Sequence, residues 1–244
     1  MICLGLDSAG KTAGVAVTQD GRLLYEVYLA NGLTHSVSLM PLVKSAFDTL
    51  SLTSADIDLF GVNAGPGSFT GLRIGLSLVK GLSLPHNTPT AGVSTLYSLA
   101  CSFMGEGTVL AALDARRGEV YAAMFACNNG VVTRLCEDAA MPATALLPLV
   151  QNARTPIWLM GDGAALAYTA LGGISGVQMA APAHILGHAS GVCAAAVQLH
   201  QAGQSTNGDA LSAEYHRLSQ AQRERNERAA AQSKAAAQEG TDVQ

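Results

Sequence analysis

The order of the predicted elements repeats once along this 244-residue chain, and the repeat constrains the fold more than any other feature. In the first half, apolar periodicity predicts strands at 2–7, 12–19 and 22–29, a helix at 34–50, a strand at 59–64, a helix at 71–84, a strand at 89–93 and a helix from residue 94. In the second half it predicts strands at 108–114, 119–127 and 131–136, a helix at 143–151, a strand at 156–160, a helix at 164–171, a strand at 177–180 and a helix at 184–202. Each half therefore has the order β-β-β-α-β-α-β-α, which predicts a duplicated α/β fold.

The repeat and a change in composition divide the chain into three parts. The first strand of each half ends in an aspartate, Asp7 and Asp114. We therefore expect a first half at 1–103 and a smaller second half at 104–218. Residues 219–244 are mostly Ala, Gln, Arg and Glu, with almost no branched apolar side chains, which predicts a disordered or frayed helical tail.

Composition limits the partners and the compartment of the protein. The formal net charge is −4, so no strong overall field attracts nucleic acid, and any such contact would come through a larger assembly. The five cysteines are odd in number and include no Cys-x-x-Cys pair, which indicates a reduced, cytoplasmic compartment. No apolar run is long enough to span a bilayer, so we expect no membrane partner.

A glycine-rich turn, the signature loop, connects the strand at 59–64 to the helix at 71–84. It comprises Gly65, Pro66, Gly67, Ser68, Phe69, Thr70, Gly71 and Arg73. Glycine allows backbone angles that a Cβ forbids, and Ser68 or Thr70 can cap the following helix. A strand, a glycine turn and a helix N-terminus predict either an anion site or a tight packing corner.

The signature loop also carries a family resemblance. The sequence AGPGSFTGLRIG at 64–75 resembles the signature of the TsaB (YeaZ) family of bacterial tRNA threonylcarbamoyladenosine biosynthesis. Other segments are similar to that family in order and spacing: LGLDS at 4–8, PTAGVSTL at 89–96, LDARRGEVY at 113–121 and GDGA at 161–164. The resemblance covers residues 1 to about 200 and implies the actin-like fold of the sugar-kinase and Hsp70-type ATPases.

The resemblance implies a non-catalytic scaffold subunit. Members of the family heterodimerise with the catalytic subunit TsaD, which transfers a threonylcarbamoyl group to the tRNA adenosine beside the anticodon, and they work with the ATPase TsaE. We therefore expect a TsaD-like and a TsaE-like partner, with tRNA reached only through the complex. The resemblance also implies no cofactor on the chain alone, and at most ATP or ADP at the junction with TsaD.

The helices at 34–50 and 71–84 are the predicted docking surface. The second is apolar almost all around, and such a helix must be covered on every side, by its own domain or by a partner. The predicted interface residues are Val37, Met40, Phe47, Leu72, Leu76 and Val79. An exposed apolar patch seeks cover, so the chain alone is expected to form a homodimer through this surface.

The resemblance further implies a vestigial nucleotide site. In active actin-like ATPases, hairpins after such aspartates hold metal and phosphates, and the corresponding residues here are Asp7, Asp114, Arg116 and Arg117. The aspartates could equally be structural turn residues, and the arginines a solvated hairpin tip. The alternative function is an independent actin-like ATPase or kinase, which would need Asp7 or Asp114 to hold magnesium.

Two short patterns suggest a phosphate-binding P-loop and a serine hydrolase, but neither stands in the sequence context that such a site requires. The run from Gly5 to Thr12 matches G-x-x-x-x-G-K-T, but Lys11 leads into a strand, whereas a P-loop needs a helix there. Ser68 lies in a glycine turn that is not Gly-x-Ser-x-Gly, which argues against a serine hydrolase.

We expect no metal site. His184 and His188 have the spacing of two ligands on one helix face, but no third ligand is evident nearby. By resemblance, Thr95 and Leu99 stand where TsaD carries its metal histidines, and neither side chain can replace them. A metallopeptidase is therefore the least favoured function.

Overall fold

The computed structural model describes residues 1–215, of which residues 1–214 form one compact unit. The predicted tail at 219–244 and the predicted end of the second half at 218 lie outside the described residues. Within them, no helix combines the length and the apolar character needed to cross a bilayer.

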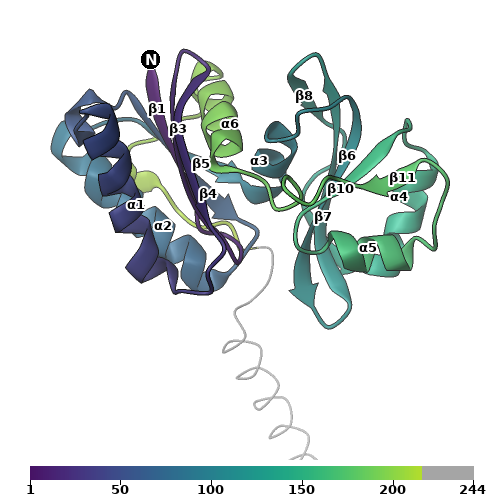
Figure 1. The fold of residues 1–244 in the computed structure, drawn as a ribbon. Coiled ribbons are helices and arrows are strands. Elements are labelled where there is room, and N and C mark those ends of the chain that lie inside the picture. The colour runs from purple at the N-terminus through teal and green to yellow at the C-terminus, as the bar shows by residue number, and fades with distance from the viewer. Residues whose placement is uncertain (216–244) are drawn as a thin grey trace, which may run out of the picture. The chain divides into compact units, whose positions relative to one another are not determined.

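The first sheet has five strands in the order β3-β2-β1-β4-β5 (Figure 1). These are β1 (Ile2–Asp7), β2 (Ala13–Gln19), β3 (Arg22–Leu29), β4 (Leu59–Gly65) and β5 (Thr90–Ser94). β1 pairs antiparallel with β2 and parallel with β4. One face is covered by α1 (His35–Leu50) and α2 (Phe69–Ser83), and the short 3₁₀ turns Ser54–Asp56 and Leu84–His86 lie in the connections.

The second sheet repeats this topology. Its order is β11-β10-β6-β7-β8, and β9 also pairs with β7. The strands are β6 (Gly107–Arg116), β7 (Glu119–Asn128), β8 (Val131–Arg134), β9 (Ala139–Pro142), β10 (Ile157–Met160) and β11 (Val177–Met179). The remaining helices of this part are a 3₁₀ turn (Ala143–Leu146), α4 (Leu147–Gln151) and α5 (Ala164–Ala170). In both sheets the first strand is central, with the second and third on one side and the parallel strands on the other, so the predicted duplication is confirmed.

The last helix of each half packs against the sheet of the other half. Leu96 and Leu99 of α3 (Thr95–Cys101) are buried together with Phe125 of the second sheet. Val192 of α6 (Ala189–Gln201) is buried with Cys3 and its neighbours in the first sheet. Since α3 and α6 also contact one another, the two halves share a continuous interior. After α6, a 3₁₀ turn (Gly208–Ala210) leads the chain back along the first sheet.

The elements that differ from the sequence-based prediction include α2, α6 and β9. Helix α2 begins at Phe69 rather than 71, because the Ser68 hydroxyl accepts a 3.3 Å hydrogen bond from the Gly71 amide and caps the helix. Helix α6 begins at Ala189 rather than 184, because Gly187 has a φ of +74° and His188 is extended. Strand β9 was not predicted.

Candidate functional site

A groove lies between α1 and α2 on the outer side of the first sheet. Its volume is about 520 Å³, and Leu39, Met40, Phe69, Ile74 and Leu78 supply its apolar walls. The Arg73 guanidinium carbon lies 3.9 Å from the centroid of the Phe69 ring, a cation–π contact at the wall. We call this feature the α1–α2 groove.

The predicted interface residues divide into an exposed and a buried set. Val37 and Met40 are 62% and 49% exposed, and Phe47 is half-buried against the core. Leu72, Leu76 and Val79, by contrast, are buried in the core of the chain itself. Predicting direct partner contact for these three was wrong, because the face of α2 that carries them packs on the first sheet. Ile74 and Leu78, on the other side of α2, line the groove instead.

The signature loop is a tight packing corner. The Ser68 amide donates a 2.7 Å hydrogen bond to the Ala9 carbonyl, and the Ser8 hydroxyl donates one of 2.9 Å to the Gly71 carbonyl. A Cβ on Gly67 or Gly71 would lie less than 3.0 Å from the backbone of residues 8 and 9. Real Cβ atoms essentially never approach other atoms so closely. Of the two predicted roles, the structure therefore supports the packing corner, since the loop bonds to its own chain.

This packing corner links the groove to the loop that follows β1. His35 lines the groove, and its Nε2 lies 2.9 Å from the Gly10 carbonyl oxygen. Because a carbonyl oxygen only accepts, this contact requires a proton on Nε2. Gly10 in turn lines a second cavity, so one short loop borders both features.

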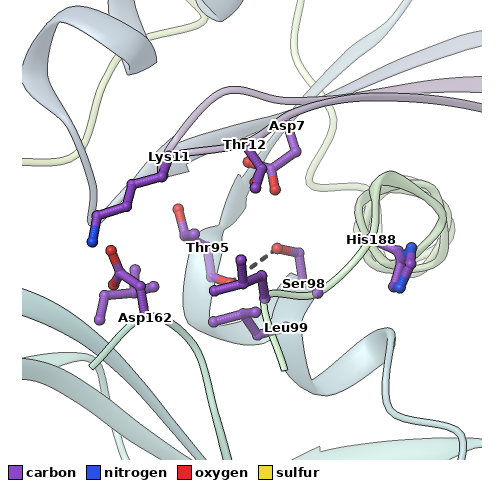
Figure 2. A pocket seen from close by; sticks show the side chains of 12 residues that line it. Asp7, Lys11, Thr12, Thr95, Ser98, Leu99, Asp162 and His188 are labelled. Carbon is purple, nitrogen blue, oxygen red and sulfur yellow. Dashed lines mark hydrogen bonds between the residues drawn. The ribbon is translucent and has the colours of Figure 1, made fainter. Parts of the chain in front are cut away.

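The second cavity, the central pocket, lies among the β1–β2 loop, α3 and the loops at 162 and 186–188 (Figure 2). Its polar lining includes Asp7, Lys11, Thr95, Asp162 and His188. In Figure 2 the Lys11 side chain extends toward Asp162. The volume open within it is about 20 Å³, room for about one water molecule and far less than a nucleoside needs.

Asp7 and Thr95 of the pocket are shielded from solvent, whereas Lys11 is exposed. Asp7 Oδ1 accepts hydrogen bonds from the Ala9 amide (3.0 Å) and the Asn63 side-chain amide (2.9 Å). Burial raises the pKa of Asp7, while these two hydrogen bonds and the charge of His35 act in the opposite direction. Thr95 is buried, and its hydroxyl oxygen has no hydrogen-bond partner within the described part of the chain.

The four residues of the predicted vestigial nucleotide site do not converge on one cavity. Asp7 lines the central pocket, and Asp114 is one hydrogen bond away, its amide donating to Asp162 Oδ1 at 2.9 Å. Arg116 and Arg117 are exposed at the turn between β6 and β7. The prediction missed Lys11 and Asp162 as pocket residues. For Asp162 there was a signal, because it follows the fourth strand of its half as the signature loop does in the first.

The two short sequence patterns do not form the sites that they suggest. Strand β2 begins at Ala13, directly after the G-x-x-x-x-G-K-T run, so no helix follows Lys11 as a P-loop requires. His184 and His188 precede α6 instead of sharing a helix face. Their ring centroids are 5.3 Å apart, and His188 Nδ1 lies 3.5 Å from Glu26 Oε2. In residues 1–215, no group of three or more His, Cys, Asp or Glu side chains is arranged to hold a metal.

Two sheets of one topology, exchanged last helices and a polar pocket between them define the actin-like class of fold. The family model for TsaD, tRNA N6-adenosine threonylcarbamoyltransferase, matches residues 32–238. The tRNA threonylcarbamoyladenosine biosynthesis protein TsaB of Bacillus subtilis is 29% identical over 167 residues, which cover 68% of this chain and 73% of that protein.

The Escherichia coli protein of the same name is 37% identical over 135 residues, covering 54% of this chain and 58% of that protein. The solved structure of YeaZ from Pseudomonas aeruginosa aligns with a TM-score of 0.74 at 26% identity, covering 88% of this chain and 99% of that one. The chain therefore belongs to the TsaB/YeaZ family.

Proposed function

We propose that this chain is a non-catalytic, cytoplasmic subunit of tRNA N6-threonylcarbamoyladenosine biosynthesis that docks a TsaD-like transferase through the α1–α2 groove. The observation that carries the proposal is the groove itself. It is large, apolar and open, and Val37 and Met40 beside it expose much of their side chains to solvent. Exposed apolar surface of this kind marks an interaction site.

The family relationship supports a TsaD-like protein as the occupant. The family model that matches most of this chain is that of the transferase, so the two proteins share a fold. A transferase of this fold has its own counterparts of α1 and α2. Like surfaces then pack around a pseudo-twofold axis, as they do in isologous dimers. By the same argument, a second copy of this chain occupies the groove when the transferase is absent.

The central pocket supports a non-catalytic role. Its cavity of about 20 Å³ leaves no room for a nucleotide or a threonylcarbamoyl donor. The transferred group, the reacting atoms and the catalysis are therefore assigned to the partner. A TsaE-like ATPase and ATP or ADP at the junction of the complex stay predictions from the family resemblance.

Light scattering tests the association. The chain is measured alone and mixed with the TsaD protein of the same organism, each at a concentration where both are folded. We expect a stable heterodimer to replace any homodimer. Persistence of two separate species would overturn the docking proposal.

Reconstituted tRNA modification tests the role in the reaction. The transferase, the ATPase and the enzyme that supplies the threonylcarbamoyl donor are combined with and without this chain. We expect modified adenosine only when the chain is present. Equal modification in its absence would contradict the scaffold role even if the heterodimer forms.

A further inference from the structure

The β6–β7 turn differs from the other hairpin turns of the chain, and we infer that its Arg116 and Arg117 bind phosphates of the tRNA backbone in the assembled complex. The inference rests on the proposed function, because it takes tRNA as the substrate of that complex. It adds a contact between this subunit and the substrate.

Within residues 1–215, three hairpins turn through two residues in the left-handed conformation. The β2–β3 turn uses Asp20 and Gly21, with φ of +50° and +80°, and the β7–β8 turn uses Asn129 and Gly130, with +51° and +75°. Asp, Asn and Gly are the residues that adopt these angles most readily. Two of the three turns therefore have the residues that backbone sterics favour.

The β6–β7 turn departs from this rule. Arg117 and Gly118 have φ of +58° and +77°, so an arginine occupies the position that Asp and Asn fill elsewhere. Arg116 is also left-handed, with a φ of +68°, beside a register shift in the β6–β7 pairing. The left-handed conformation costs an L-residue other than Gly, Asn or Asp about 1–2 kcal/mol. Two adjacent arginines at these angles indicate that the side chains are kept for another purpose.

Asp114 and Asp162 hold this strained turn in place. Asp114 Oδ1 accepts a 2.7 Å hydrogen bond from the Arg116 amide, and the Asp114 amide donates to Asp162 Oδ1. Asp114 and Asp162 thus fix the backbone that carries the two arginines. Their role here is to position the turn.

The guanidinium groups remain available for a ligand. The Arg116 side chain is 78% exposed, and its one ion pair in residues 1–215 is a long one, with Nη1 3.9 Å from Asp114 Oδ2, beyond hydrogen-bond distance. Arg117 is exposed and has no ion pair with any residue in 1–215. A guanidinium presents five N–H donors in a planar fork that fits a phosphate. Adjacent arginines on one turn therefore suit two neighbouring phosphates.

The shape of the site favours a polyanion over a free nucleotide. The turn is exposed, and the nearby central pocket, at about 20 Å³, cannot take a base or a ribose. An RNA backbone, in contrast, presents its phosphates outward. With a net charge of −4, the chain supplies only a local contact, and the rest of the complex supplies the remaining affinity.

The test is a salt titration of tRNA binding by the assembled complex, with wild-type chain and with the double variant Arg116→Asn/Arg117→Asn. Asparagine gives the turn a residue suited to its backbone, so we expect thermal stability to be equal or higher. We expect tRNA affinity to fall, and the slope of log K against log salt to become shallower by about 1.4–1.8, since each of the two lost phosphate contacts contributes about 0.7–0.9. Arg22→Asn/Arg154→Asn, which removes two exposed arginines elsewhere, should leave the slope unchanged.

Complex formation is measured on the same samples by light scattering, which separates this inference from the proposed function. An intact complex whose slope is the same for wild type and Arg116→Asn/Arg117→Asn overturns the inference. If no complex forms, the docking proposal fails, and the inference, which rests on it, fails with it. A variant that loses binding of MgATP while keeping its tRNA slope would assign the arginines to a nucleotide and contradict the RNA contact.

Discussion

The α1–α2 groove and the central pocket lie on either side of one short loop, yet they differ in size and chemistry. His35 lines the groove and bonds to Gly10, which lines the pocket. The groove is about 520 Å³ and mostly apolar, whereas the pocket is about 20 Å³ and holds two carboxylates and a lysine. An open apolar surface suits a protein partner, whereas a pocket of this volume has no room for a substrate. The contrast supports the proposal that the chain acts by association.

The largest expected change in the free energy of unfolding comes from a substitution in the signature loop, the packing corner near the α1–α2 groove and the central pocket. Gly71→Ala places a Cβ against the Ser8 carbonyl and the His35 ring, neither of which can withdraw without moving the loop or α1. We expect the free energy of unfolding to fall by about 3 kcal/mol or more, at the upper end of overpacking effects. Denaturant titration followed by circular dichroism measures it.

Gly81→Ala is the matched control for that substitution. Gly81 lies in the same helix, and a Cβ there would meet nothing within 4 Å. We expect the free energy of unfolding to rise by about 0.5–1 kcal/mol, because alanine has the higher helix propensity. Equal losses in the two variants would show that the signature loop is not a tight packing corner.

A smaller effect is expected from the carboxylate of the central pocket. Burial raises the pKa of Asp7, so the folded state binds a proton more readily than the unfolded state does. The wild-type free energy of unfolding therefore falls as the pH rises from the ordinary aspartate value through the folded pKa, and it stays reduced above that. Asp7→Asn removes the charge while its side-chain oxygen can still accept from the Ala9 amide.

We accordingly expect Asp7→Asn to be more stable than wild type at pH 7, with the difference shrinking as the pH is lowered toward 4. Denaturant titrations at several pH values measure this difference. The reconstituted complex should modify tRNA equally well with either chain. Loss of modification with an intact heterodimer would show that the pocket takes part in the reaction.

The smallest expected effect is that of MgATP on the chain alone. The central pocket does not accommodate a nucleotide, so we expect no change in melting temperature at millimolar MgATP. A ligand at 100 times its Kd would stabilise the fold by about 2.7 kcal/mol, which a thermal shift assay detects readily. If MgATP raises the melting temperature of the wild type by several degrees but not that of Asp7→Asn, a nucleotide binds in the central pocket. The pocket would then be a ligand site, contrary to the contrast drawn with the groove.

Much of the fold could be predicted from local signals. Asp20–Gly21 and Asn129–Gly130 predict two hairpin turns because few other pairs tolerate their backbone angles. The repeated element order predicts the duplicated topology. Strand β9 could not be predicted, because its four residues show no clear alternation and its partner β7 is separated from it in the sequence by β8.

Other features depend on contacts that periodicity does not encode. The apolar face of α6 shows that the helix is buried, but not that it covers the sheet of the other half. Similarly, Leu72, Leu76 and Ile74 are all apolar, and only the position of the first sheet decides which of them reach the groove. Lys11 and Asp162 meet at the pocket from distant parts of the sequence. Their proximity is a property of the assembled fold.

The most direct test of the account compares two exposed methionines. Met40 is 49% exposed at the α1–α2 groove, and Met104 is 89% exposed in the loop after α3, so an aspartate at either position meets solvent in the free chain. The affinity of each variant for the TsaD protein of the same organism is measured by titration calorimetry, after both are shown to fold. We predict that Met40→Asp weakens binding at least tenfold, or about 1.4 kcal/mol, and that Met104→Asp leaves it unchanged. Wild-type affinity for Met40→Asp would contradict docking through the groove.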